Sequence, residues 1–559
     1  MSPLRRLLSS VLWLSVCTGT ASAQEKTRFS HADTLRGTNS PQRSWWDVAF
    51  YDLHVSVSPS DSTIKGYNVI TYRVLRPATE MQIDLQMPLV ADSILQDGKP
   101  LTFKRDSNAF FVAVPSAPKG STRSVTVYYH GRPRVARRPP WDGGFGWGVD
   151  SLDRPYFSTT DEGLGASVWW PTKDIPSDEP DSQRIAITIP DPSIDVSNGR
   201  LRNTVKNADG TTTYEWFVAN PINNYDVAVN AGGYEHFSDS YKGEGGTLTL
   251  DFWPLSYHLD AAKAQFTQVK PMLACFEKWF GPYPWYTDGY KLVETAHLGM
   301  EHQSAVAYGN LYANGYRSKD PTGPGSHWVD LSNTGLGLEW DFIIVHESAH
   351  EWWGNNITAE DHADMWIHES FANYAENLFE ECQKGKAAGA RYVIGTRAKV
   401  RNEAPIIGHF GVNAEGSGDM YYKGGNMLHT IRQIINDDTK WRAILRGLNA
   451  TYRHGIASGR DIEDYINTKS AINFDKVFTQ YLMTTRIPTL EYDIQGGVLW
   501  YRWSDVVPGF DMPIRAHTME GPDVLLRPTE KWKSVPLDVS EAAFKLDENF
   551  YVRQVRVAK

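Results

Sequence analysis

The pattern of hydrophobic and polar positions changes along the chain. Between residues 46 and 254, short runs rich in β-branched and aromatic residues alternate with turn residues, which predicts strands. The predicted strands are Val48–Pro59, Lys65–Leu75, Met81–Gln86, Ala109–Val114, Thr122–His130, Ile185–Ile189 and Gly246–Pro254. This part of the chain is therefore expected to form an all-β domain.

Helical spacing of apolar residues replaces this pattern between residues 259 and 482. The predicted helices are Ala262–Trp279, Leu336–Trp353, Trp366–Glu381, Lys386–Arg401, Tyr421–Ile435 and Lys440–Tyr452. Residues 291–307, between the first two helices, read as strands and a turn. This part is therefore expected to be a mixed α/β domain.

Strand patterning returns after Pro488 and continues to the last residue. The predicted strands are Leu490–Ile494, Val498–Trp503, Met512–Ala516, Ser534–Leu537 and Tyr551–Val557. They fit a small β-sandwich. We predict an α+β multidomain fold whose domains cover residues 24–254, 255–484 and 485–559.

The first residues of the chain indicate export. Arg5 and Arg6 precede an apolar stretch over residues 7–16, and small residues at 21–23 offer a cleavage site before Gln24. This predicts a signal peptide over residues 1–23 and a protein that is periplasmic or secreted. A lipoprotein signal ending at Cys17 is the alternative, which Val16 fits poorly. No later segment has the run of about twenty apolar residues that a stable membrane span needs.

The net charge bears on possible partners, and the cysteine content bears on a possible disulfide. The formal net charge of the 559 residues is −10 and no cluster of Lys and Arg forms a stripe, so nucleic acid is not expected as a partner. After removal of a signal peptide, Cys275 and Cys382 are the remaining cysteines. An exported protein permits a disulfide between them. Buried free thiols are an equally good reading.

Residues 139–148 contain two prolines, four glycines and three aromatic residues, which predicts a loop. An ordinary surface loop is the simpler interpretation. The alternative is that its aromatic residues line the entrance to an active cleft.

The chemistry of the chain centres on residues 346–350, which read His-Glu-Ser-Ala-His. Positions four apart share one face of a helix, so His346 and His350 can direct two imidazoles at one metal ion. Glu347, next to His346, is placed to take a proton from a metal-bound water. Catalytic zinc sites use three protein ligands and a water. Glu369, on the next predicted helix, has the spacing of a third ligand. The alternative, two chance histidines on a surface helix, does not explain Glu369.

Two further motifs accompany the metal site. Gly299-Met300-Glu301 precedes it, and Tyr421-Tyr422-Lys423-Gly424 follows it. Together with the metal motif, they resemble those of the M1 family of zinc aminopeptidases, the gluzincins related to aminopeptidase N. The resemblance covers most of the chain. It implies a β-saddle domain, a thermolysin-like catalytic domain and a small C-terminal β-sandwich, without the helical C-terminal domain of many members. The chain departs from the family at His302, where the family carries Asn.

The resemblance implies roles for individual residues. Glu301 is expected to bind the substrate's α-amine, with Glu162, upstream of Trp169 and Trp170, as a second carboxylate for it. Tyr421 is expected to donate a hydrogen bond to the oxyanion of the transition state. Glu376 is a candidate to hold a ligand histidine through its free ring nitrogen.

These residues together predict a zinc-dependent aminopeptidase with one Zn²⁺ per chain, acting on peptides with a free N-terminus. In this mechanism Glu347 is the general base and His346, His350 and Glu369 hold the metal. A zinc endopeptidase of thermolysin type, an epoxide hydrolase activity in the same cleft, and a non-catalytic binding protein are the alternatives. The sequence does not show the side-chain preference or the oligomeric state.

Overall fold

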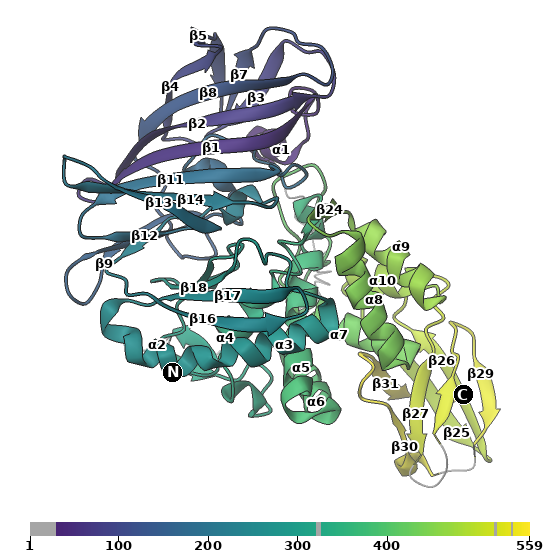
Figure 1. Cartoon of the computed structure of the whole chain (residues 1–559). Helices are drawn as coiled ribbons and strands as arrows, with labels where there is room; N and C mark the ends of the chain where they lie inside the picture. The colour runs from purple at the N-terminus through teal and green to yellow at the C-terminus, as the bar shows by residue number, and fades with distance from the viewer. Residues whose placement is uncertain (1–28, 320–325, 519–522, 538–539) are drawn as a thin grey trace, which may run out of the picture.

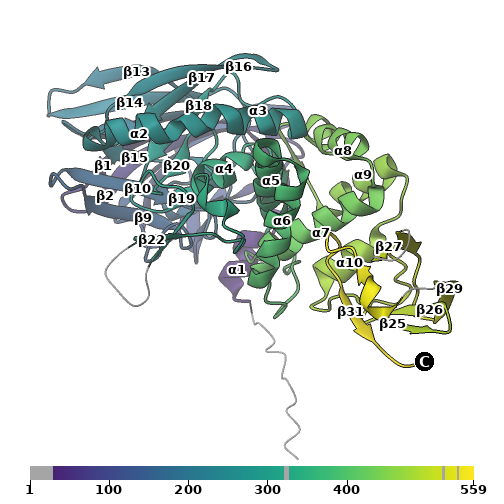
Figure 2. The same cartoon turned by 90° about the horizontal axis from the view of Figure 1, so that it is seen from below.

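The computed structural model describes residues 29–319, 326–518, 523–537 and 540–559 (Figures 1 and 2). The predicted signal peptide and Cys17 lie outside these residues. In both views the N-terminal strands and the C-terminal strands lie at opposite ends of the molecule, and the helices lie between them. Among the described residues, no helix has the length and apolar character that crossing a membrane would require.

The largest sheet belongs to the N-terminal part and has eight strands in the order β13-β14-β11-β1-β2-β8-β4-β5. Their bounds are Arg200–Lys206 (β13), Thr211–Val218 (β14), Ser182–Pro190 (β11), Trp46–Ser58 (β1), Thr63–Val74 (β2), Thr122–Gly131 (β8), Val90–Gln96 (β4) and Lys99–Pro100 (β5). Burial alternates along most of β1, as expected for a strand with one face on a core. The predicted strands in this sheet are confirmed, and β4, β5, β13 and β14 are additional.

Two smaller sheets complete the N-terminal part. One has the order β3-β7-β6 and the other β12-β15-β10-β9. Their strands are Glu80–Asp84 (β3), Ala109–Ala113 (β7), Phe103–Asp106 (β6), Ile194–Val196 (β12), Asn230–Gly232 (β15), Pro155–Thr160 (β10) and Gly144–Val149 (β9). The loop predicted over residues 139–148 is wrong in its second half, because Gly144–Val149 pairs with β10. The glycines of this segment favour a loop in the sequence, but the segment forms a strand because β10 provides its hydrogen-bond partners.

A five-stranded sheet begins the part of the chain that carries most of the helices, in the order β16-β17-β18-β20-β19. Its strands are Phe237–Gly243 (β16), Gly246–Trp253 (β17), Tyr290–Glu294 (β18), Val306–Tyr308 (β20) and Gly299–Met300 (β19). The sheet crosses the boundary predicted after residue 254, because β17 pairs in parallel with β18. Leu248 and Leu250 also belong to the core of the helical part. The local pattern identified β17 as a strand but could not show which sheet it joins.

Ten α-helices occur in the described residues, nine of them between residues 259 and 483. They are His31–Gly37 (α1), Leu259–Gln265 (α2), Val269–Phe280 (α3), Phe342–Ala349 (α4), Trp366–Lys384 (α5), Lys386–Thr396 (α6), Asp419–Ile435 (α7), Asp438–Thr451 (α8), Gly459–Ser470 (α9) and Asp475–Met483 (α10). Two further strand pairs join Tyr316–Lys319 (β21) to Ser326–Val329 (β22) and Ile357–Ala359 (β23) to Gly455–Ala457 (β24).

Three predicted features of these helices need correction. The helix predicted from Leu336 begins at Phe342, because the Asp341 side chain caps it by accepting bonds from the next backbone N–H groups. The helix predicted over 262–279 is divided between α2 and α3 by a short 3₁₀ turn. Helices α9 and α10 were not predicted.

The C-terminal strands form two sheets, with the orders β29-β26-β25-β31 and β28-β27-β30. Their bounds are Lys533–Pro536 (β29), Val498–Ser504 (β26), Thr489–Gln495 (β25), Arg553–Arg556 (β31), Val524–Leu526 (β28), Ile514–Thr518 (β27) and Phe544–Leu546 (β30). The core is continuous with that of the helices, and Tyr481 of α10 donates a hydrogen bond to the carbonyl of Tyr551 (2.6 Å). The arrangement agrees with the predicted small β-sandwich.

Cys275 of α3 and Cys382 of α5 form a disulfide, with their Cα atoms 6.0 Å apart. Of the two readings left open by the sequence, the disulfide is therefore the one found. It joins α3 to the helix that carries Glu369 and Glu376.

Candidate active site

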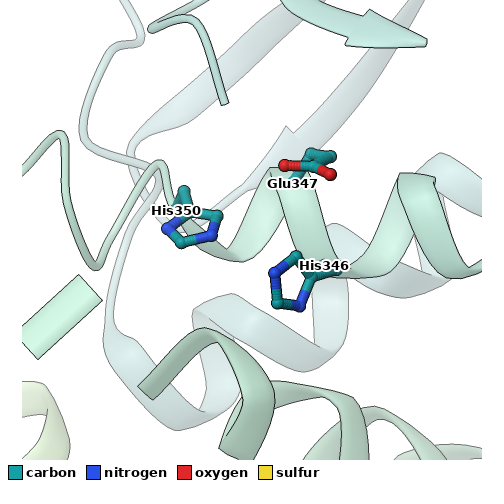
Figure 3. A group of neighbouring side chains, drawn as sticks. All are labelled: His346, Glu347 and His350. Carbon is teal, nitrogen blue, oxygen red and sulfur yellow. The ribbon is translucent and has the colours of Figure 1, made fainter. Parts of the chain in front are cut away.

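Helix α4 carries the metal motif into the core. All of its residues are buried. Asp341, which caps the helix, also accepts a hydrogen bond from Tyr308 (2.7 Å) and is held in place by it. His346 and His350 project from this helix with their rings next to each other, and Glu347 projects from the same helix (Figure 3). Ligand atoms of these three residues lie within 4.8 Å of one another.

Glu369, in the first turn of α5, completes the group. Its Oε2 atom is 3.5 Å from Nε2 of His346 and 3.5 Å from Nε2 of His350. Ligand atoms that bind a tetrahedral zinc at about 2.0–2.2 Å lie about 3.3–3.6 Å apart, so this spacing fits one ion. Glu369 Oε2 is also buried without a hydrogen-bond partner. Glu369 is therefore a better third ligand than Glu347, and the donor set fits zinc.

Both histidines are fixed by their other ring nitrogen. Nδ1 of His346 lies 2.8 Å from Oε1 of Glu376, and Nδ1 of His350 lies 2.9 Å from the carbonyl oxygen of Trp353. A carbonyl only accepts, so His350 donates from Nδ1 and presents Nε2 to the metal. Glu376 is held in turn by Tyr392 (2.8 Å). The contact predicted for Glu376 is confirmed.

Glu347 faces the edge strand β19. A Cβ atom at Gly299 would lie 2.6 Å from Oε1 of Glu347, so glycine at this position leaves room for the carboxylate. Burial raises the pKa of Glu347 to about 7, although His346 acts in the opposite direction. A carboxylate with a pKa in this range can accept a proton and release it near neutral pH.

Two further carboxylates belong to the site. Glu301, directly after β19, is buried and accepts a hydrogen bond from Tyr225 (3.1 Å). Its backbone carbonyl accepts one from Asn355 (2.8 Å), which lies just beyond His350. Glu162, half-buried in the loop after β10, lines the same cavity. Burial raises the pKa of both groups, and repulsion by Glu301 raises that of Glu162 further. A cationic amine would relieve this repulsion.

Tyr421 lies in the first turn of α7, and its hydroxyl donates a hydrogen bond to Oε1 of Glu369 (2.9 Å). It reaches α5 because α7 packs closely on that helix. A Cβ atom at Gly424 would lie 1.9 Å from Oγ of Ser370, so the two backbones can approach only with glycine at this position. The glycine of the Tyr421–Gly424 motif thus sets the position of its tyrosine.

These side chains surround a cavity of about 300 Å³. Among the described residues, six glutamates and no lysine or arginine line it; the glutamates are Glu162, Glu301, Glu347, Glu369, Glu376 and Glu415. Pro140 and Trp141 also line it, which supports the interpretation that residues 139–148 contribute to the entrance. All seven predicted site residues lie in this cavity: His346, His350, Glu369, Glu347, Tyr421, Glu301 and Glu162.

Sequence reasoning missed Tyr225, Asn355 and Glu415. None belongs to a motif, and Tyr225 and Glu415 lie far along the chain from the metal ligands. His302, where the family carries Asn, is fully buried and is not among the residues that line the cavity. Burial lowers the pKa of His302 to about 3, so it is neutral.

Comparisons with known proteins agree with this site. Residues 330–481 match the model of the Peptidase family M1 domain. The chain is 25% identical over 235 residues to aminopeptidase N of Lactobacillus delbrueckii subsp. lactis, covering 38% of this chain and 26% of that protein. It is 23% identical over 308 residues to aminopeptidase N of Lactobacillus helveticus, covering 47% of this chain and 34% of that protein. The chain thus spans about a quarter to a third of the length of these relatives.

Solved structures show the same fold. An M1 zinc metallopeptidase from Deinococcus radiodurans matches with a TM-score of 0.65 and 19% identity, over 79% of this chain and 94% of that one. A variant of an M1 zinc metallopeptidase from the same organism, solved with a bound Tyr-Ser-Ala substrate, matches with a TM-score of 0.65 and 19% identity, over 80% and 96% of the two chains. The predicted α+β multidomain fold is therefore confirmed.

Proposed function

We propose that the chain is a zinc-dependent aminopeptidase, which removes the N-terminal residue from peptides; the match of residues 330–481 to the Peptidase family M1 domain supports this. The observation that carries this proposal is the position of Glu301 and Glu162 in the cavity of the metal ligands. Two carboxylates in the cavity of the proposed metal ligands, one buried and one half-buried, can recognise a cationic amine by charge-assisted hydrogen bonds, each worth about 1.5–3 kcal/mol.

The metal ligands would be His346, His350 and Glu369, which suit zinc by their chemistry and spacing. A zinc ion bound there supplies Lewis-acid chemistry and lowers the pKa of a bound water to about 7. Glu376 and the Trp353 carbonyl keep the two imidazoles oriented toward it.

The remaining steps belong to the protein's own side chains. Glu301 and Glu162 hold the substrate's ammonium group, so the first peptide bond is the one that reaches the metal. Glu347 takes the proton of the attacking water and delivers it to the leaving amine. The Tyr421 hydroxyl donates a hydrogen bond to the oxygen on which negative charge develops. Its bond to Glu369 (2.9 Å) shows that the hydroxyl reaches the ligand shell.

The test uses one peptide with a free N-terminus and the same peptide acetylated, each with and without a metal chelator. Chelator-sensitive release of the first residue from the free peptide alone is the expected result. Equal cleavage of both peptides would indicate an endopeptidase and remove the roles given to Glu301 and Glu162. No cleavage of either would contradict the peptidase assignment and bring back the epoxide or binding alternatives, which no feature of the described residues favours.

We also propose that the protein is exported after removal of residues 1–23 and works in the periplasm or outside the cell. The Cys275–Cys382 disulfide supports this, because such bonds persist mainly in oxidising compartments. N-terminal sequencing of the mature protein should begin at Gln24. Cytoplasmic protein that still begins at Met1 would contradict export.

A further inference from the structure

A second cavity adjoins the active site. It has a volume of about 590 Å³ and shares Tyr316, Gly418 and Tyr422 with the cavity of the metal ligands. Its other walls come from the end of β22 and the residues after it, from the segment between α6 and α7, and from the start of α7. They include Val329, Leu331, Lys399, Arg401, Glu403 and Asp419. Because the walls are shared, the two cavities lie side by side and together extend the space available to a substrate.

The arrangement of the site indicates in which direction a bound peptide would run through the two cavities. Glu301 is held on the His350 side, through Asn355. On the other side, the ring of Phe342 stacks on His346, with 5.0 Å between their centroids. Tyr316 meets Phe342 edge to face at 5.2 Å. Aromatic side chains thus lead from His346 to the second cavity. A peptide whose ammonium group lies at Glu301 and whose first carbonyl lies at the metal must continue toward this side.

The charges of the two cavities differ. Neither lysine nor arginine lines the active-site cavity, whereas Lys399 and Arg401 both line the second one. Both side chains are exposed, and no described ion pair involves either of them. Asp419 is buried, and its carboxylate accepts hydrogen bonds from the backbone N–H groups of Arg401 (2.8 Å) and Asn402 (2.6 Å), which satisfy both of its oxygens but leave its charge in place. Glu403 is the remaining acidic wall residue and is exposed.

We propose that the second cavity binds the C-terminal part of the peptide substrate and that Lys399 and Arg401 pair with its terminal carboxylate. The inference rests on the proposed aminopeptidase function and names its substrate class, short peptides with a free C-terminus. Acidic side chains without a lysine or arginine line the described part of one end of the groove, and two exposed cations stand beside two carboxylates at the other. The cations are the groups that can pair with a peptide's terminal carboxylate, and this difference fixes the peptide's orientation.

The experiment compares peptides of two to six residues that begin with the same residue, each as a free acid and as a C-terminal amide. At the length that spans both cavities, KM for the free acid should be about three- to tenfold lower than for the amide, with similar kcat. Combined replacement Lys399→Ala and Arg401→Ala should remove this difference, and Lys399→Glu with Arg401→Glu should reverse it. Arg391→Ala is the matched control, because Arg391 is exposed on α6 and lines neither cavity.

An aminoacyl p-nitroanilide, which has no C-terminal peptide part, separates this inference from the proposed function. All of these variants should hydrolyse it at the rate of the unaltered protein. If the protein hydrolyses it but treats acid and amide alike at every length, the carboxylate site is refuted and the aminopeptidase stands. The same holds if the preference for the acid persists in the double alanine variant. If the protein hydrolyses neither the anilide nor any peptide, both proposals fail.

Discussion

Replacement of Gly424 by alanine should slow catalysis, although the residue at this position is not expected to contact a substrate. The added Cβ atom would lie 1.9 Å from Oγ of Ser370 and 2.6 Å from its Cβ. Rotation of the Ser370 hydroxyl relieves the first contact but leaves the second. Non-bonded carbon atoms pack at about 3.5–4.0 Å, so α7 has to move by about 1 Å away from α5.

The size of the effect follows from the position of Tyr421, one turn earlier on the same helix. Its hydroxyl lies 2.9 Å from Glu369, and a shift of about 1 Å removes this alignment. Misplacement of this size can cost on the order of 10²-fold in rate. We therefore expect kcat to fall about 10- to 100-fold, and overpacking to cost about 1–3 kcal/mol of stability. KM should change little, because Glu301 and Glu162 lie on other segments.

The assay is steady-state hydrolysis of an aminoacyl p-nitroanilide by Gly424→Ala, by Ser370→Gly and by the double variant. Removal of the Ser370 side chain takes away both clashing atoms, so the double variant should recover most of kcat relative to Ser370→Gly alone. Gly455→Ala is the control, since its Cβ atom would meet nothing closer than 3.4 Å. Unchanged kcat in Gly424→Ala, or no recovery in the double variant, would refute the packing argument.

Four further changes test other parts of the site. Glu347→Gln should retain zinc by metal analysis and lose about 10²–10⁴ in kcat, and normal turnover would exclude Glu347 as the base. Glu301→Ala should raise KM for free-amine substrates, so an unchanged KM would contradict its role. Glu376→Gln should weaken metal binding about 10- to 100-fold in chelator competition; equal affinity would mean that Glu376 does not support His346. Cys382→Ser opens the link to Cys275 and should lower the free energy of unfolding by about 2–4 kcal/mol, seen as a lower urea midpoint. The same midpoint in both proteins would show that the disulfide adds no stability.

The metal centre was predictable because its geometry is local. Residues four apart on a helix share a face whatever surrounds them, so the spacing alone places His346 and His350 side by side. The positions of Glu369 and Tyr421 depend on how α5 and α7 pack, and the sequence indicates that packing only through the spacing of family motifs. Tyr225 and Glu415 have no such signal, because Tyr225 lies on a short 3₁₀ helix and Glu415 in a loop, and neither belongs to a motif.

The fold shows the same division between local and distant information. Most long strands and helices of the first two parts were predicted from their periodicity. The pairing of β17 with β18 was not, because a strand carries no mark of its partner. The link between Cys275 and Cys382 joins residues separated by 107 positions, and two cysteines alone left two readings open. The strand β9 was not predicted because its glycines favour a loop; the strand forms because it pairs with β10.

The active cavity is assembled from segments that are far apart in the chain. Residues 330–481 contain His346, His350 and Glu369, but Glu301 and Glu162 lie outside them. In the proposed function, the groups that would break the bond and the groups that would hold the substrate's amine therefore come from different segments of the chain. A variant without the carboxylates at 162 and 301 would keep the proposed metal ligands and the proposed base, but it would lose the groups proposed to select the first peptide bond. Such a variant is expected to cut peptides without regard to their N-terminus.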